Sequence, residues 1–361
     1  MLIQLAITGM LVALLPLSIV WVSGDSDKYR KLVWVTLFLT FDLIVFGAFT
    51  RLTDSGLGCP DWPGCYGQAN PLQAHADISA AQAAMPTGPV TVVKAWIEMI
   101  HRYLAMCVGV LIIALMVIAW RKWLQSARKD IKFSPLFPTV LFVFVCLQGA
   151  FGAWTVTMKL QPVIVTTHLL LGMTLLALLA WFGARQGHHP QVAQSAAVLS
   201  RPAALAVVLL VVQIALGGWV STNYATLACM DFPLCQGVLW PEMDFANGFT
   251  LWRNLGMTSG GEYLPAHALT AIHWAHRFFA FVVIAFIVWL ARRALKIDGL
   301  HKIARGLLAM VVLQFTIGVL TVFLEFPLAL AVAHNAGAAL LVFLLATLNY
   351  KIRTAAGAAP G

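Results

Sequence analysis

Nine long apolar runs constrain this chain more than any other feature of its sequence. They lie near residues 2–22, 31–50, 94–120, 136–157, 162–184, 203–222, 269–292, 303–325 and 328–349. A helix needs roughly 20 apolar residues to cross a bilayer, and each run has about that length. Only 10% of the 361 residues are charged, whereas a soluble domain has about 25%. We therefore expect an all-α polytopic membrane protein.

The first apolar run could also be a signal peptide. However, no basic residue precedes the run, and no A-x-A cleavage site closes it. We expect residues 1–30 to form an extra, uncleaved N-terminal transmembrane helix and its connector.

The net charge of +9 raises the question of a nucleic-acid partner. If the nine runs alternate in direction, seventeen of the 23 lysines and arginines fall in connectors on one side. The opposite side carries only Arg51, Lys94, Lys159 and Arg253. Cytoplasmic loops carry such an excess, so we expect the N-terminus outside and the C-terminus in the cytoplasm. We expect the membrane itself to be a bacterial inner membrane. The basic charge therefore indicates topology and no nucleic-acid partner.

Two stretches of the sequence resemble each other and indicate an internal repeat. GAFTRLTDSGLGCPDWPGCYG begins at Gly47, and GGWVSTNYATLACMDFPLCQG begins at Gly217. His101-Arg102 recurs as His276-Arg277, and the 20-residue spacing from Gln148 to His168 recurs from Gln314 to His334. We expect two four-helix halves, residues 31–185 and 203–350, joined by a cytoplasmic linker, 186–202, and followed by a cytoplasmic tail, 351–361. Because four spans return the chain to its starting side, the halves should be parallel and related by a pseudo-twofold axis along the membrane normal.

Four histidines lie at matching depths in the predicted spans, namely His101 and His168 in the first half and His276 and His334 in the second. Two imidazoles on neighbouring helices can bind one haem iron from opposite sides. A single buried histidine is often satisfied by a nearby hydroxyl or carbonyl, but four in two repeated pairs favour two haem sites. A bare metal ion would need three or four ligands. No C-x-x-C-H motif is present, so we expect haem without thioether bonds.

Glu98 lies one helical turn before His101, and His273 has the same position before His276. A carboxylate beside a haem edge could exchange protons or stabilise a cationic intermediate. The alternative is a structural carboxylate paired with Arg102 or a loop lysine. His273 is a candidate for a haem-edge contact, for an alternative ligand or for a structural role.

Arg102 and Arg277 are rare charged residues in apolar spans, and haem propionates are plausible partners for them. The alternative is that they extend to the outer headgroups. Arg51 is a further candidate for a propionate or haem-edge contact. Asp42 lies in the middle of the second span, and the sequence assigns it no partner.

Four cysteines lie in the two long outer connectors, where an oxidising compartment favours disulfides. We expect the pairs Cys59–Cys65 and Cys229–Cys235, either as structural links or, in the first loop, as a redox relay. A zinc site is the alternative, but the C-x-x-C pairs that such sites use are missing.

From Phe46 to Tyr350 the chain resembles the haem A synthase family. The resemblance is carried by RLTDSGLGCPDWPGCYG from Arg51, EMIHRY from Glu98, TTHLLLG from Thr166, HWAHRF from His273 and AHNAGA from Ala333. It implies oxidation of a ring methyl of haem O to a formyl group by successive hydroxylation, for the biogenesis of terminal oxidases. The extra helix at 2–22 departs from the family's eight-helix plan.

The resemblance also assigns roles to the candidate residues. His276 and His334 would hold the iron of haem b, the substrate haem O would bind near His101, His168 and Arg102, and Glu98 would be the catalytic carboxylate. Candidate partners besides the bilayer are a haem O synthase, a quinol or other electron donor, and a second copy of the chain. The alternative function is a two-haem cytochrome b-type electron carrier without haem-modifying activity; a transporter would need a polar cavity near the membrane midplane.

Overall fold

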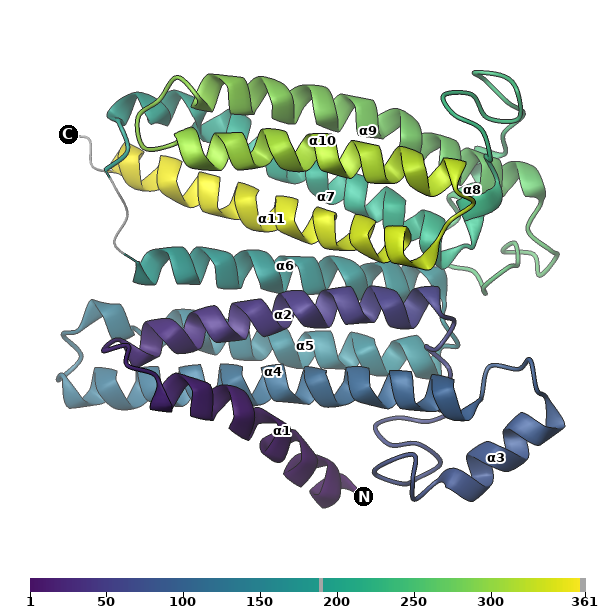
Figure 1. The fold of residues 1–361 in the computed structure, drawn as a ribbon, viewed down its shortest axis with the longest axis horizontal. Coiled ribbons are helices and arrows are strands. Elements are labelled where there is room, and N and C mark those ends of the chain that lie inside the picture. The colour runs from purple at the N-terminus through teal and green to yellow at the C-terminus, as the bar shows by residue number, and fades with distance from the viewer. Residues whose placement is uncertain (188–190, 358–361) are drawn as a thin grey trace. The chain divides into compact units, whose positions relative to one another are not determined.

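The computed structural model describes residues 1–187 and 191–357, and this part of the chain is helical with only isolated β-bridges. The α-helices are α1 Leu2–Val22, α2 Lys28–Leu52, α3 His75–Ala84, α4 Val92–Gln125, α5 Leu136–Thr157, α6 Pro162–Gln186, α7 Ser200–Thr222, α8 Phe245–Gly248, α9 Ala266–Ala294, α10 His301–Phe323 and α11 Leu328–Gly357 (Figure 1). Within the described residues, nine helices are long and apolar enough to cross a membrane, which confirms the nine predicted spans.

Local signals define several helix ends. The Asp27 side chain accepts a hydrogen bond from the backbone N–H of Arg30 and begins α2, and Thr91 does the same for α4 through Lys94. Threonine hydroxyls inside the spans donate to carbonyls one turn earlier, as Thr36 does to Leu32, and this satisfies the hydroxyl donor within the helix.

The structure adds helical segments that we did not predict. Helices α3 and α8 lie in the two outer connectors, and α11 continues to Gly357, into the segment 351–361 that we expected to be a tail. Residues 188–190 in the expected linker and residues 358–361 lie outside the described residues.

The chain forms two compact units, which we call the first and the second unit. The first consists of Met1–Leu160 and Thr174–Gly187, and the second of Gln161–Met173 and the chain after Gly187. The boundary therefore passes through α6, whose early turns, with His168, belong to the second unit.

In the first unit, α4 packs against α1, α2 and α5. The later part of α6 completes this bundle: Phe182 stacks on Phe137 of α5 with ring centroids 5.0 Å apart, and Gly183 lies against Trp34 of α2. Figure 1 shows α2, α4 and α5 running side by side.

In the second unit, four helices form a closed ring. Helix α7 packs against α9, α9 against α10, α10 against α11, and α11 against α7. Helices α9 and α11, which carry His276 and His334, are thus diagonal members of one four-helix bundle.

Candidate functional site

The first outer connector folds into a tight loop around a disulfide between Cys59 and Cys65. The carboxylate of Asp61 accepts hydrogen bonds from the backbone N–H groups of Tyr66 and Gly67, both at 2.7 Å. An acceptor at this position satisfies the donors of the turn, so the loop keeps one conformation without a regular secondary structure.

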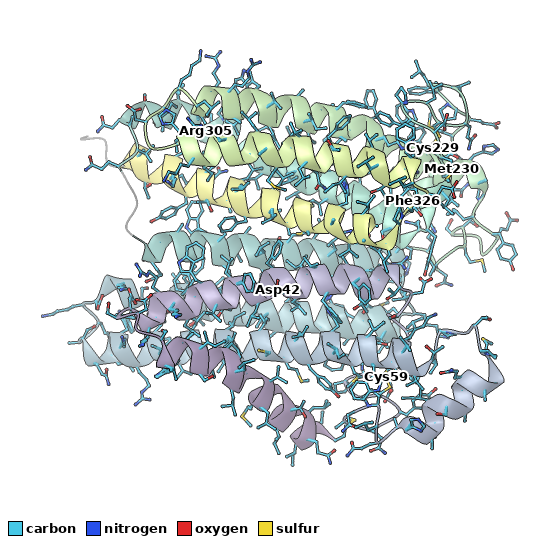
Figure 2. The ribbon with its side chains drawn as sticks, viewed as in Figure 1. Asp42, Cys59, Cys229, Met230, Arg305 and Phe326 are labelled. Carbon is cyan, nitrogen blue, oxygen red and sulfur yellow. A yellow bond between two sulfur atoms is a disulfide. The ribbon has the colours of Figure 1, made fainter. Side chains whose placement is uncertain are left out.

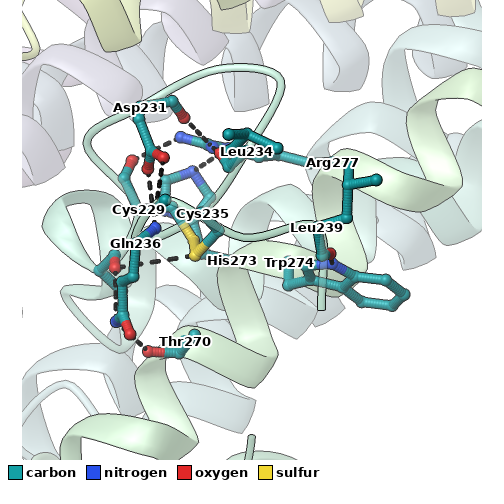
Figure 3. The surroundings of a disulfide bond; sticks show 12 residues. Cys229, Asp231, Leu234, Cys235, Gln236, Leu239, Thr270, His273, Trp274 and Arg277 are labelled. Carbon is teal, nitrogen blue, oxygen red and sulfur yellow. Dashed lines mark hydrogen bonds between the residues drawn. A yellow bond between two sulfur atoms is a disulfide. The ribbon is translucent and has the colours of Figure 1, made fainter. Parts of the chain in front are cut away.

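The second outer connector contains the equivalent loop, closed by a disulfide between Cys229 and Cys235 (Figure 3). Here Asp231 accepts from the N–H groups of Gln236 and Gly237, both at 2.8 Å. Slight burial raises the pKa of Asp231, but the N–H groups of Gly237 and Gln236 outweigh that effect and hold the pKa below its usual value.

Under the first loop lies a buried ion pair between Glu98 and Arg102 of α4. Glu98 is only 4% exposed, and its second oxygen accepts a hydrogen bond of 2.8 Å from the backbone N–H of Cys59. Arg102 donates to three loop carbonyls, those of Asp61, Pro63 and Gly64. The structure therefore contains the pairing with Arg102 that was the structural alternative for Glu98, and it ties this carboxylate to the disulfide.

Under the second loop, Arg277 of α9 takes the place of Arg102. Its guanidinium donates to the carbonyls of Cys229, Asp231 and Leu234 (Figure 3). Its Nε donates to Nε2 of His273 at 3.1 Å, and His273 is 4% exposed. Where the first unit buries a carboxylate, the second unit buries an imidazole.

These contacts bear on the arginine predictions. The structure directs both guanidinium groups, of Arg102 and Arg277, to loop carbonyls, and Arg51 forms a 3.2 Å ion pair with Asp54. Contact of the three arginines with haem propionates stays a prediction.

Helix α1 extends to the first loop. Leu5 belongs to the apolar cluster that contains Cys59 and Cys65, and a Cβ added to Gly64 would lie 2.7 Å from Sδ of Met1. Figure 2 labels Cys59 in this region, near the beginning of α4. Sequence reasoning assigned no role to α1, because an apolar helix gives no sign of which surface it covers.

Glycines on neighbouring helices make room for the candidate haem ligands. A Cβ on Gly47 of α2 would lie 2.9 Å from Cε1 of His101, and one on Gly217 of α7 would lie 2.9 Å from Cε1 of His276. On α10, a Cβ on Gly318 would lie 3.0 Å from Cε1 of His334. The first two distances are shorter than a real Cβ contact and the third is unusually tight, so each glycine leaves room for an imidazole that a larger residue would crowd.

Glutamine amides contact the two histidines of the second unit. Nε2 of Gln213 lies 3.1 Å from Nδ1 of His276 and donates to the His276 carbonyl at 3.2 Å. Nε2 of Gln314 donates to the His334 carbonyl at 2.9 Å. Gln213 was missed by sequence reasoning; the signal that could have revealed it is the spacing of four residues to Gly217, which recurs from Gln314 to Gly318.

The two histidines of the first predicted pair lie in different units. The ring of His101 stacks on Phe46 of the first unit, with centroids 6.3 Å apart. His168 lies in the early part of α6, where Thr166 bonds to Thr222 of α7 at 3.1 Å. Their pairing on one substrate therefore stays a prediction. Asp42 lies half-buried in the middle of α2 (Figure 2).

The donor groups of the second unit fit a haem better than a bare metal ion. Among the described residues, no group of three or more histidine, cysteine, aspartate or glutamate side chains could hold a metal ion. The second unit instead has two imidazoles on diagonal helices of one bundle, each in a glycine recess. His276 and His334 would together hold a haem iron.

Comparison with known proteins places the chain among membrane proteins of one family. Residues 30–346 match the model of the COX15-CtaA family, described as cytochrome oxidase assembly protein. A protein of Shewanella oneidensis named Heme A synthase is 40% identical over 326 residues, which cover 89% of this chain and 96% of that protein. A Heme A synthase of Caulobacter vibrioides is 31% identical over 91% of this chain and 98% of its own length.

Proposed function

The chain belongs to the COX15-CtaA family of cytochrome oxidase assembly proteins, and on this premise we propose that it is a haem A synthase. It is an oxidoreductase that acts on haem O. In this proposal the protein oxidises a ring methyl of haem O to a formyl group by successive hydroxylation. It spans the membrane several times and holds a resident haem b.

The observation that carries the proposal is the pair of imidazoles in the second unit. His276 and His334 come from diagonal helices of one closed bundle, and Gly217 and Gly318 leave the recesses that the rings fill. These two histidines would hold haem b. When bound, this haem supplies the redox chemistry that side chains alone cannot perform.

The first unit offers His101, Arg102 and Glu98 for the proposed substrate site, whereas His168 belongs to the second unit. His101, beside Phe46 and Gly47, would bind haem O together with His168 and Arg102. Glu98, one turn from His101, would be the catalytic carboxylate. Its bonds to the Cys59 N–H and to Arg102 fix the position of the carboxylate, so a proton held there has a defined location.

The orientation in the membrane follows from charge. The excess of lysine and arginine in one set of connectors directs that side to the cytoplasm, so both disulfide loops would lie outside in a bacterial inner membrane. An oxidising outer compartment suits both cystines. The candidate partners are a haem O synthase as the source of substrate and a quinol or other electron donor for the redox chemistry.

Identification of the extracted haems separates the synthase from its rival, an electron carrier with two permanent haems. The protein is expressed in a host that makes haem O, purified, and its haems are extracted and identified by mass. We expect haem b together with haem O, its hydroxylated product or haem A. Haem b as the sole pigment, with haem O unchanged in the membranes, would favour the carrier.

The role of Glu98 is tested by Glu98→Gln, because glutamine keeps the shape and an oxygen for the Cys59 N–H but removes the charge. We expect haem b content to stay at the wild-type level while conversion of haem O falls about 10²-fold or more. His273→Gln is the matched control in the second unit and should affect conversion far less. Conversion by Glu98→Gln at the wild-type rate would refute the assignment.

A further inference from the structure

The tips of the two disulfide loops have opposite environments. At the offset of 170 residues that relates the two cystines, Ala69 and Asn70 of the first loop correspond to Leu239 and Trp240 of the second. Ala69 is 2% exposed, whereas Leu239 and Trp240 are each 69% exposed. The second loop thus presents two large apolar side chains where the first loop has a buried alanine and an asparagine.

In the first unit, protein covers the tip of the loop. Ala69 belongs to the apolar cluster that contains Leu5 of α1 and the cystine. The Ala69 carbonyl also accepts a hydrogen bond of 2.8 Å from the hydroxyl of Tyr103. In the described part of the second unit, no helix covers Leu239 and Trp240 in this way, since both side chains stay largely exposed.

Trp274 of α9 holds the second tip against a membrane-spanning helix. Its indole Nε1 donates to the Leu239 carbonyl at 3.0 Å (Figure 3). Its ring lies 4.6 Å from that of Trp240 and stacks on Phe278 with centroids 4.9 Å apart. Trp274 lies about two turns inside α9, which begins at Ala266. The tip is therefore beside the span and not beyond its end.

The basic end of α9 sets the depth of Trp274 in the membrane. Arg292 lies 18 residues further along the helix, which corresponds to roughly 27 Å at about 1.5 Å per residue. A charged arginine head stays at the headgroups, and the hydrocarbon core of a bilayer is about 30 Å thick. Trp274 and the tip that it holds therefore lie near the opposite boundary of the core, where tryptophan is enriched in membrane proteins.

The surface of α9 that continues from Trp274 is apolar and exposed. Large side chains recur along it at helical spacing, namely Phe278, Phe281, Val282 and Trp289. No charged residue lies between Asp231 and Glu242, so the tip extends this surface without a break in its apolar character. This continuity with the lipid-facing side of a span indicates lipid as the partner of the tip.

We propose that Leu239 and Trp240 insert into the membrane leaflet on the side of the disulfide loops and anchor the second loop there. Trp274 is the positioning residue that fixes the tip at this depth. The leaflet covers the second tip as α1 covers the first. This inference goes beyond the proposed function, because it does not depend on the haem chemistry.

The first test measures the depth of the tip in phosphatidylcholine nanodiscs. Cys107 and Cys146, which lie outside the disulfides, are replaced by alanine, and Trp240→Cys is labelled with a nitroxide. Collisions of the label with oxygen, which concentrates in the bilayer, are compared with collisions with a water-soluble nickel chelate. Asn70→Cys is the matched control in the first loop.

We expect collisions with oxygen to exceed those with the chelate severalfold at position 240, and the ratio to be lower at position 70. An excess of chelate collisions at position 240 would place the tip in water, and few collisions with either reagent would place it under protein. Both results would overturn the proposal. Leu239→Cys should agree with Trp240→Cys, and because it keeps the Trp240 ring it serves as the probe if Trp240→Cys misfolds.

The second test measures what the leaflet contributes to the loop. Leu239→Ala combined with Trp240→Asn gives the second loop the tip of the first, and Trp240→Phe is the control that keeps an aromatic ring. The amide of Val238 donates to the Cys235 carbonyl. In the double variant we expect this amide to exchange about tenfold faster or more, because two large side chains lose apolar burial. Trp240→Phe should exchange nearly as the wild type does. The anchor is refuted by an unchanged exchange rate in the double variant.

Discussion

The two disulfide loops are nearly the same structure placed over different chemistry. Each has a six-residue cystine separation, an aspartate that accepts from two backbone N–H groups, and an arginine from the following long helix that donates to three loop carbonyls. Beneath them, however, Glu98 faces Arg102 in the first unit, and His273 faces Arg277 in the second. Two similar loops can thus keep one framework while the residue beneath them changes from a glutamate to a histidine.

The difference lies in the residue beneath each loop and not in the loop itself. The arginines hold the loops, so they are the shared framework. Glu98 and His273 each lie one turn before the arginine of their own helix, and Glu98 also accepts a hydrogen bond from the loop at the Cys59 N–H. We therefore expect the two units to respond unequally to equivalent substitutions.

The largest inequality concerns the histidines. His276→Ala or His334→Ala should lower haem b affinity more than about 100-fold, because loss of an axial ligand exceeds the usual effect of losing its supporting partner. His101→Ala should keep haem b and stop conversion of haem O. Haem content from pyridine haemochrome spectra checks both. Retention of haem b by His276→Ala would break the assignment of the permanent site to the second unit.

A second inequality concerns the arginines. Arg102→Ala leaves the buried Glu98 carboxylate without its ion-pair partner, so the free energy of unfolding should fall by about 3–5 kcal/mol. Arg277→Ala removes hydrogen bonds but leaves no buried charge, so the free energy of unfolding should fall by only about 1–3 kcal/mol. Hydrogen exchange of the two loop backbones measures this difference. Glu98→Gln combined with Arg102→Ala should recover part of the loss, whereas equal effects of the two single arginine variants would contradict the comparison.

The third inequality comes from α1, which contacts the first loop through Leu5 and Met1. Leu5→Ala should remove at most about 1.5–3 kcal/mol of the stabilisation that apolar burial gives the loop. Reduction of the first disulfide should then be faster by roughly tenfold or more. The Cys229–Cys235 disulfide should be unaffected. Alkylation of freed thiols followed by mass spectrometry distinguishes the two cystines within one sample.

The smallest effect is a pH dependence in the second loop. The pKa of Asp231 is held below its usual value, mainly by the N–H groups of Gly237 and Gln236 working against slight burial. A depressed folded-state pKa stabilises the loop above the unfolded pKa, and this stability is lost as pH falls through the folded value. Exchange of the Gln236 and Gly237 amides should therefore increase between about pH 4 and pH 2. Asp231→Asn should make the exchange rates independent of pH in this range, after correction for intrinsic exchange.

The nine spans and the cystine positions could be predicted from the sequence, because they depend on local properties. A run of about 20 apolar residues needs no tertiary context to favour a membrane helix. The repeated motifs likewise singled out His276, His334 and Glu98 as candidate site residues, and their roles stay predictions. Helices α3 and α8 were not predicted, because short helices in long connectors have no distinctive pattern.

The sequence by itself determined which residues are candidates for the chemistry, whereas the tertiary structure decided what those residues touch. Sequence spacing places Glu98 near His101 on one helix, but only the folded loop brings the Cys59 N–H to the carboxylate across 39 positions of the chain. Likewise, the pairing of Gln213 with His276, 63 positions apart, depends on the packing of α7 against α9. The physical reason is that periodicity reports a residue's own helix, while a hydrogen bond between helices depends on their rotation and depth, which the packing of the whole bundle sets.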